Sequence, residues 1–233
     1  METKEVQSPK GRTVTLTYRE DSSDLATIGA TWRLWGKLED EYRLASLPPL
    51  KGTALDIGAH IGSVALALLV DHPDLRVIAV EPLAENVAVM RLNAVNLDVA
   101  DRLTILTAGI SATDWATVQW NWRGGINDGY WQNNRYIGNV LTGEVGIEHD
   151  EANVPGILLT SLVPKRERIP VMKIDCEGCE WVALADKVTR RIDRIVGEYH
   201  GHPGPEGLRA MLASHDVEVR EDGACGMFWA VKR

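Results

Sequence analysis

The chain has 233 residues, of which 45% are hydrophobic and 25% charged, and its formal net charge is −8 at pH 7. This length and apolar content suit one large domain with a substantial core. The acidic balance argues against a duplex nucleic acid or an anionic membrane as the main partner, since either would select a basic surface. We therefore expect no nucleic-acid partner and no membrane partner.

The N-terminal residues are polar, and no stretch approaches the roughly 18 apolar residues that a membrane span needs. Two of the three cysteines, Cys176 and Cys179, form the single C-x-x-C of the chain. This pair is either a redox motif, half of a zinc site with His200 and His202, or two ordinary thiols. Because no second C-x-x-C is present, we expect ordinary thiols and no metal site. The polar N-terminus and the lack of a membrane span, with which the cysteine content is consistent, predict a cytoplasmic protein.

The first 50 residues are predicted to form a cap rather than a separate domain. Residues 13–18 alternate in hydrophobicity like a strand. Residues 21–47 then carry apolar side chains at helical spacing, until Pro48 and Pro49 end the pattern. We therefore expect one strand and one long helix in this segment.

From residue 53 the pattern alternates between strands and helices, which implies parallel strands joined by right-handed crossovers. Strands are expected at 53–57, 76–80, 103–107, 171–174 and 194–199, helices at 63–70, 85–96, 179–186 and 205–214, and a closing strand pair at 217–220 and 227–231. The sequence therefore predicts one α/β unit over residues 51–233. Its seven-stranded sheet is mostly parallel, with an antiparallel C-terminal edge hairpin and helices on both faces.

The turn after the first of these strands has the spacing D-x-G-x-x-x-G, from Asp56 through Gly58 to Gly62. Gly58 permits a turn conformation closed to other residues, and Gly62 lets the next helix start close to the strand and to a ligand. The spacing is not the G-x-G-x-x-G of dinucleotide-binding proteins. An acid before the first glycine suits a ligand with a cationic amino group, such as S-adenosylmethionine; the alternative is an ordinary tight turn.

A second acid, Glu81, ends the strand at 76–80 and is followed by Pro82. In nucleotide-binding α/β folds a carboxylate at this place accepts both ribose hydroxyls of the ligand. The alternative is a solvated acid at a strand end. Because Glu81 accompanies the glycine turn, we predict ribose binding.

Three motifs together resemble the FkbM-type methyltransferase family. They are D-I-G-A-H-I-G at 56–62, E-P at 81–82 followed by Asn86, Asn93 and Asn96, and K-I-D-C-E-G-C-E at 173–180. Residues 21–25 and 41–42 also resemble family signatures, whereas His60 stands where the family usually has asparagine. The resemblance implies a Rossmann-like class I methyltransferase fold and S-adenosylmethionine as the cofactor. It also implies methylation of a hydroxyl on a small-molecule acceptor, a sugar or a secondary metabolite, as in natural-product biosynthesis.

The motifs give a set of candidate cofactor-binding residues. They lie in the glycine turn, at the end of the second strand and after the third, and they are Asp56, Gly58, Ala59, His60, Gly62, Glu81, Pro82, Asn86 and Gly109.

Candidate catalytic residues lie at the tips of two further strands. Asp175 follows the strand at 171–174, and Glu198 and His200 close the strand at 194–199. A carboxylate or an imidazole there could accept the proton of the acceptor hydroxyl. Alternatively, Asp175 caps the following helix and His200 is a solvated loop residue. Lys173 is expected to pair with a buried acid rather than to act in chemistry.

The segment from 115 to 136 combines aromatic residues with asparagines, which suits an acceptor-binding flap. Its candidate acceptor contacts are Trp122, Tyr130 and Trp131; the alternative is a hairpin whose indoles pack on the sheet. A strand is expected at 118–122.

Three other functions remain open from the sequence. An N-methyltransferase for an amine or amide of a peptide or nucleoside natural product would use the same cofactor motifs. A non-catalytic scaffold would not need Asp56, Glu81 and Asp175 together. An oxidoreductase with a dinucleotide cofactor would require the missing third glycine.

Overall fold

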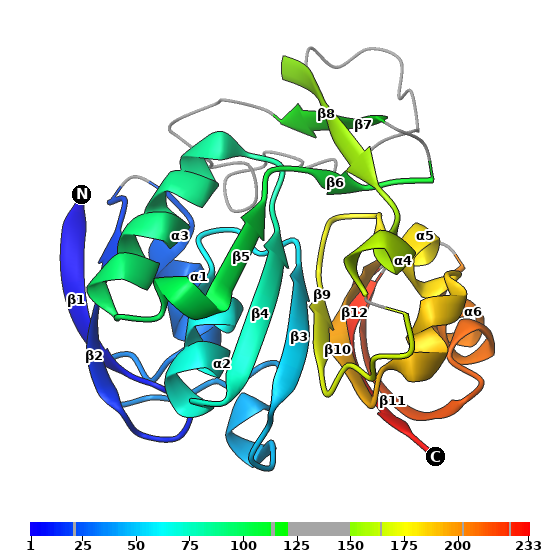
Figure 1. Ribbon diagram of the computed structural model, residues 1–233, viewed down its shortest axis with the longest axis horizontal. Coiled ribbons are helices and arrows are strands. Elements are labelled where there is room, and N and C mark those ends of the chain that lie inside the picture. The colour runs from blue at the N-terminus through cyan, green and yellow to red at the C-terminus, as the bar shows by residue number, and fades with distance from the viewer. Residues whose placement is uncertain (21, 113–114, 121–149, 164, 202, 224) are drawn as a thin grey trace.

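A seven-stranded sheet forms the centre of the computed structural model, which describes all residues except 21, 113–114, 121–149, 164, 202 and 224 (Figure 1). The strand order is β11-β12-β10-β9-β3-β4-β5. The strands are β3 (Gly52–Ile57), β4 (Leu75–Val80), β5 (Leu103–Leu106), β9 (Met172–Ile174), β10 (Arg194–His200), β11 (His215–Asp222) and β12 (Cys225–Lys232). Among these strands only β12 runs in the opposite direction to the other six, and it forms an antiparallel hairpin with the edge strand β11. The predicted sheet and edge hairpin are therefore confirmed.

Helices cover both faces of this sheet, as predicted. Alternate strand residues enter two separate cores, because successive side chains of a strand point to opposite faces. One core contains residues of α1 (Asp24–Thr31), α2 (Ser63–Asp71) and α3 (Ala84–Asn96). The other contains residues of α4 (Leu159–Leu162), α5 (Glu180–Leu184) and α6 (Gly204–Met211). Short 3-10 turns lie at Leu44–Ser46, Ala100–Arg102 and Lys187–Arg191.

The N-terminal segment differs from the prediction of one strand and one long helix. An additional strand, β1 (Glu2–Gln7), forms an antiparallel hairpin with β2 (Thr13–Tyr18). The helix α1 ends at Thr31, because Arg33 leaves the helical path and its backbone pairs with that of Gln7. Trp32 is fully buried, and its indole Nε1 donates to the carbonyl of Ser63 at 3.1 Å. The apolar spacing beyond Thr31 therefore reflects tertiary packing rather than a helix.

The N-terminal hairpin is fastened to α3 by the side-chain amide of Asn93. Its Oδ1 accepts from the backbone N–H of Thr17 at 2.7 Å, and its Nδ2 donates to the Thr17 carbonyl at 2.9 Å. Asn93 is buried, so the amide satisfies a strand edge that water does not reach. This contact fixes the N-terminal residues on the same face of the sheet as α2 and α3.

A second, three-stranded sheet is inserted between β5 and β9 (Figure 1). It consists of β6 (Gly109–Ile110), β7 (Trp115–Trp120) and β8 (Asp150–Ile157), in the order β6-β8-β7. The strand expected at 118–122 thus begins earlier, at Trp115. The candidate acceptor contacts Trp122, Tyr130 and Trp131 lie outside the described residues. No helix in the described part of the chain is both long and apolar enough to cross a membrane.

Candidate active site

A cavity of about 1110 Å³ lies at the carboxyl ends of β3, β4, β9 and β10. Its described walls include Gly58 after β3, Glu81 after β4, Asp175 after β9 and Glu198 on β10. Further lining residues come from α1 and from residues 34–42. The strands β3 and β9 are neighbours although far apart in the chain, so the cavity lies at the point where the strand order reverses. Ligands of open α/β sheets bind at such a point.

The turn after β3 brings two backbones into close contact. Gly58 has φ +71°, and a Cβ built on it would lie 1.8 Å from the carbonyl oxygen of Asp175. Its N–H and that of Ala59 both donate to the Val80 carbonyl at 3.0 Å. Only glycine can occupy this position without moving the Asp175 backbone. The turn is therefore a tight cradle, with Gly58 and Ala59 on the cavity wall.

Glu81 is held rigidly on the cavity wall. Its Oε2 accepts from the backbone N–H of His60 at 2.8 Å, and its Oε1 accepts from the Leu83 N–H at 3.1 Å and from Asn86 Nδ2 at 3.0 Å. Burial raises the pKa of this carboxyl, and the hydrogen bonds oppose that rise. A carboxylate offers about four acceptor positions, so capacity remains for a ligand hydroxyl. The position and chemistry of Glu81 fit the ribose of S-adenosylmethionine.

Asn86 connects Glu81 to the N-terminal segment. Its Oδ1 accepts from Arg19 Nη2 at 2.7 Å, and the same guanidinium pairs with the buried carboxylate of Asp24 at 2.6 Å. Asn86 is fully buried and is not among the described residues that line the cavity. We therefore revise its expected role from direct cofactor contact to positioning of Glu81.

Asp56 lies behind the cavity wall rather than on it. It is fully buried, and its Oδ2 accepts from the backbone N–H of Ala65 at 2.9 Å. Its Oδ1 lies 3.5 Å from Nζ of Lys173, which also donates to the Gly58 carbonyl at 2.6 Å. The expected pairing of Lys173 with a buried acid is confirmed. Asp56 is not among the described residues that line the cavity, so we propose that it supports the turn rather than contacts the cofactor amino group directly.

The remaining candidates of the cofactor set divide between the cavity and the core. Pro82 and Gly109 line the cavity beside Glu81. Gly62 does not appear among the described lining residues; a Cβ there would lie 2.4 Å from Cγ of Met90 on α3. The close approach predicted for Gly62 is therefore an approach to a neighbouring helix.

His60 has a left-handed backbone, with φ +53°, and its side chain lies beside Asp24 and Ser23. Burial lowers the pKa of its imidazole to about 4, although the charge of Asp24 opposes this. The ring is therefore neutral in the folded protein at physiological pH.

The lowered pKa of His60 predicts a loss of stability in acid. Between pH 6.5 and 4 the unfolded chain binds a proton on this ring that the folded chain does not. The free energy of unfolding therefore decreases as the pH is lowered through this range, by about 3 kcal/mol at most. Asparagine also tolerates a left-handed backbone and does not titrate. In His60→Asn, urea unfolding between these pH values should show a weaker pH dependence than in the wild type. Equal slopes would contradict the prediction.

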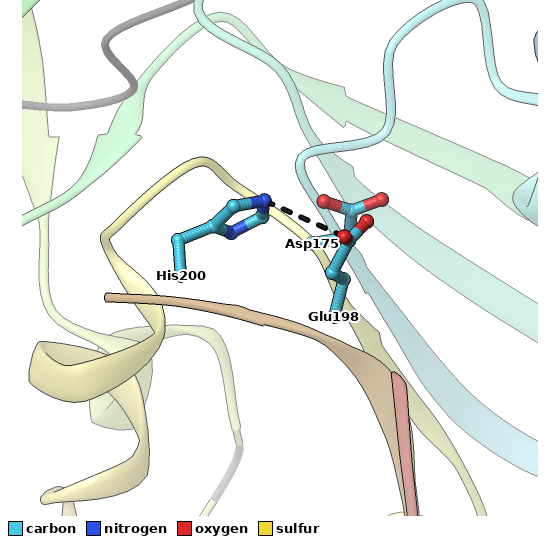
Figure 2. Close-up of side chains that lie close together, drawn as sticks. All are labelled: Asp175, Glu198 and His200. Atoms are coloured by element: carbon cyan, nitrogen blue, oxygen red, sulfur yellow. Dashed lines mark ion pairs between the residues drawn. The ribbon is translucent and has the colours of Figure 1, made fainter. Parts of the chain in front are cut away.

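The three candidate catalytic residues come together at the cavity (Figure 2). One ligand-type atom from each of Asp175, Glu198 and His200 lies within 4.8 Å of the others. Asp175 Oδ2 accepts a 2.7 Å hydrogen bond from the hydroxyl of buried Tyr42. The alternative that Asp175 caps α5 is not what the structure shows, because Cys179 occupies the N-cap position.

His200 is enclosed by carboxylates. Its Nδ1 lies 3.1 Å from Glu180 Oε1, and its Nε2 lies 3.3 Å from Glu177 Oε2 and 3.9 Å from Glu198 Oε1. Burial lowers the pKa of His200, but the hydrogen bond to Glu180 and the charges of Glu177 and Glu180 outweigh it and raise the pKa to about 10. An imidazolium has no lone pair for a proton. We therefore no longer assign proton acceptance to His200.

The two cysteines of the C-x-x-C are joined in a disulfide, Cys176 to Cys179. The expectation of two ordinary thiols is thus wrong for the folded chain. The turn that contains them places the two sulfurs together, because Glu180 accepts from the backbone N–H groups of Cys176 and Gly178, both at 2.8 Å. Both cysteines lie on the cavity wall.

Sequence reasoning gave no site role to several residues that the structure places here. Tyr42 holds Asp175, and Glu177 and Glu180 surround His200. Both sets lie inside motifs already noted, at 41–42 and 173–180, but only the fold brings them together. The apolar side of the cavity is formed by Leu25, Ala26, Ala30 and Leu34, and no sequence motif indicated that these residues line a site.

Comparison with known proteins gives the family. The model of the methyltransferase FkbM domain matches residues 56–221. No curated protein sequence matches the chain. Solved structures with a similar fold include a precorrin-6y C5,15-methyltransferase from Geobacter metallireducens, with 14% identity, 93% coverage of each chain and a TM-score of 0.47. Another is an O-methyltransferase family protein from Burkholderia thailandensis, with 9% identity, 77% coverage of this chain, 50% of the other and a TM-score of 0.43.

At such identities and TM-scores these solved structures identify neither the acceptor nor the atom that is methylated. The family model carries the assignment, because it spans most of the chain and includes the glycine turn, Glu81 and the cluster around Asp175. The chain belongs to the FkbM methyltransferase family and is an S-adenosylmethionine-dependent methyltransferase.

Proposed function

We propose that the protein methylates a hydroxyl group of a small, partly apolar secondary metabolite. The observation that carries this proposal is the position of Asp175. Its carboxylate, held by Tyr42, lies on the wall of the same cavity as the Gly58 turn and Glu81. This arrangement supports a role for Asp175 as proton acceptor beside the site that suits the cofactor.

The cofactor supplies an activated methyl group when it is bound. The protein residues bind and orient it: Glu81 would accept from the ribose hydroxyls, and the backbone of Gly58 and Ala59 would border its methionine end. Pro82 and Gly109 would flank the nucleoside, since both line the cavity next to Glu81. Such positioning accounts for much of the rate gain in a transfer between two bound molecules.

Asp175 is the proposed proton acceptor for the acceptor hydroxyl, with Glu198 as the second candidate. The Tyr42 hydroxyl fixes the orientation of Asp175 through Oδ2. Burial and the charge of Asp175 raise the pKa of Glu198 to about 7, so that this carboxyl is partly protonated at neutral pH. Asp175 ranks first because the Tyr42 hydroxyl orients its carboxylate, whereas a pKa near 7 keeps Glu198 as a workable second candidate.

The acceptor would occupy the side of the cavity formed by the N-terminal residues. Apolar side chains of Leu25, Ala26, Ala30 and Leu34 face it there. Such a wall suits an apolar ring or chain whose hydroxyl points to Asp175. We propose on this basis that residues 1–50 act as a cap over the unit formed by 51–233. The segment with Trp122, Tyr130 and Trp131 remains a proposed acceptor contact.

The experiment that tests this function measures methyl transfer from S-adenosylmethionine to matched acceptors. Each pair shares one apolar scaffold and differs in carrying a hydroxyl or an amine, and sugars and nucleosides complete the panel. Transfer to the hydroxyl member supports the proposal. Transfer to the amine member alone would favour the N-methyltransferase, for which the negative cluster around Asp175 would attract a cationic substrate.

Replacing Glu81 by alanine should weaken cofactor binding by about 2 to 3 kcal/mol, or about 30- to 150-fold in Kd, because hydrogen bonds to a buried carboxylate are lost. Calorimetry with S-adenosylhomocysteine measures this. Glu41→Ala is the matched control, since Glu41 also lines the cavity but lies on the N-terminal wall. Unchanged affinity in Glu81→Ala would place the cofactor elsewhere.

A further inference from the structure

A metal-type ligand set lies at the edge of the cavity: Asp175 and Glu198 line it, and His200 lies beside them but is not among the described lining residues. Glu198 and His200 are two residues apart on β10, so both side chains lie on the same face of that strand. Asp175 approaches from the adjacent strand end, and one ligand-type atom from each residue lies within 4.8 Å of the others (Figure 2). We propose that these three residues bind a divalent transition-metal cation.

The orientation of His200 is the second observation that points to a metal. Its Nδ1 is anchored at 3.1 Å by Glu180, a fully buried carboxylate that is itself held by two backbone N–H groups. Its Nε2 is buried and makes no hydrogen bond within the described residues. Nε2 faces two carboxyl groups, with Glu177 Oε2 at 3.3 Å and Glu198 Oε1 at 3.9 Å (Figure 2 shows the contact with Glu198). A carboxylate behind one imidazole nitrogen and a metal on the other is the usual arrangement of a ligating histidine.

Acidic side chains crowd the ring of His200. Asp175, Glu177, Glu180 and Glu198 surround one imidazole. Like charges at such short distances repel, and a dication would relieve this more completely than a single imidazolium.

The donor set indicates the class of cation. Two carboxylate oxygens and one imidazole nitrogen suit Mn²⁺, Fe²⁺ or Zn²⁺ better than Ca²⁺ or Mg²⁺, which prefer oxygen ligands alone. Three protein ligands leave coordination positions open toward the cavity. The role of the ion rests on the proposed function: it would take the acceptor oxygen as a further ligand and so fix the hydroxyl beside the methyl donor.

The test uses Mn²⁺ alone, without acceptor or cofactor. Protein treated with chelator and desalted is titrated with Mn²⁺, and calorimetry and the electron paramagnetic resonance signal of free Mn²⁺ report binding. We expect one Mn²⁺ per chain and a nitrogen coupling from the imidazole in pulsed spectra. Glu198→Gln and His200→Gln should each weaken binding by about tenfold or more, and His200→Gln should lose the nitrogen coupling.

Glu85→Gln is the matched control and should bind Mn²⁺ like the wild type, because Glu85 is an exposed residue of α3 that is not among the described residues lining the cavity. Asp175→Asn is the third ligand variant and keeps the shape of the side chain that it replaces. Circular dichroism tests whether each variant is folded. No saturable binding of Mn²⁺ at millimolar concentration would overturn the inference, as would equal affinity in all variants. Binding of S-adenosylhomocysteine and methyl transfer by the chelated protein would then show that the proposed function stands without the metal.

Discussion

Gly58→Ala is expected to lower the free energy of unfolding by about 2 to 5 kcal/mol and to abolish cofactor binding in the fraction that folds. The added Cβ would lie 1.8 Å from the carbonyl oxygen of Asp175 and 2.7 Å from its carbonyl carbon. Both are backbone atoms, so no side-chain rotation relieves the contact. The end of β9 and the turn after β3 must separate, which displaces Asp175 and the proposed methionine site together.

The control for this variant is Gly52→Ala, at the start of the same strand. Gly52 has φ +92°, and a Cβ there meets no atom within 4 Å. It shares the backbone strain of Gly58 and lacks the steric contact. Urea unfolding of both variants and calorimetry with S-adenosylhomocysteine separate the two contributions. If Gly58→Ala were no less stable than Gly52→Ala and bound the cofactor product normally, the close approach of the two backbones would not matter.

Local motifs were enough to predict the sheet and the cofactor side of the cavity. The turn from Asp56 to Gly62 and the acid at Glu81 each follow a buried strand, and parallel strands end at one edge of a sheet. A residue that directly follows one of these strands can therefore be assigned to the carboxyl edge of the sheet from the sequence alone. The same reasoning placed Asp175 and Glu198 at that edge, and the structure has both on the cavity wall.

The supporting contacts could not be predicted in the same way, because they join distant segments. Tyr42 and Asp175 are separated by 133 residues, and Arg19 and Asn86 by 67. Neither pair has a periodic or motif signal that names its partner. The burial of individual side chains could not be predicted from the sequence either. Asp56 has the sequence context of a ligand contact, yet its carboxylate faces Lys173 and the helix α2.

Two errors show how tertiary contacts override local pattern. The apolar spacing after Thr31 was interpreted as a helix, but Trp32 packs in the core from an extended backbone. Cys176 and Cys179 were interpreted as free thiols because the chain has no second C-x-x-C. The carboxylate of Glu180 instead organises the turn between them, and the two sulfurs meet.

Asp175→Asn is expected to lower turnover by about a hundredfold or more while cofactor affinity stays close to that of the wild type. Asparagine has the shape of aspartate, and its amide oxygen can still accept from the Tyr42 hydroxyl. It has no basic oxygen for the acceptor proton at neutral pH. Single-turnover rates with a hydroxyl acceptor, together with calorimetry of S-adenosylhomocysteine, measure the two effects separately.

Tyr42→Phe is the graded companion of this variant. It keeps the carboxylate of Asp175 and removes only the hydrogen bond that orients it, so turnover should fall less than in Asp175→Asn. Measurements at saturating Mn²⁺ distinguish a weakened metal site from a missing base, because added metal restores only the former.

Turnover of Asp175→Asn that equals the wild type at every acceptor concentration would move the proton acceptor to Glu198. A loss confined to KM would instead make Asp175 a binding residue for the acceptor, since a base acts on the chemical step.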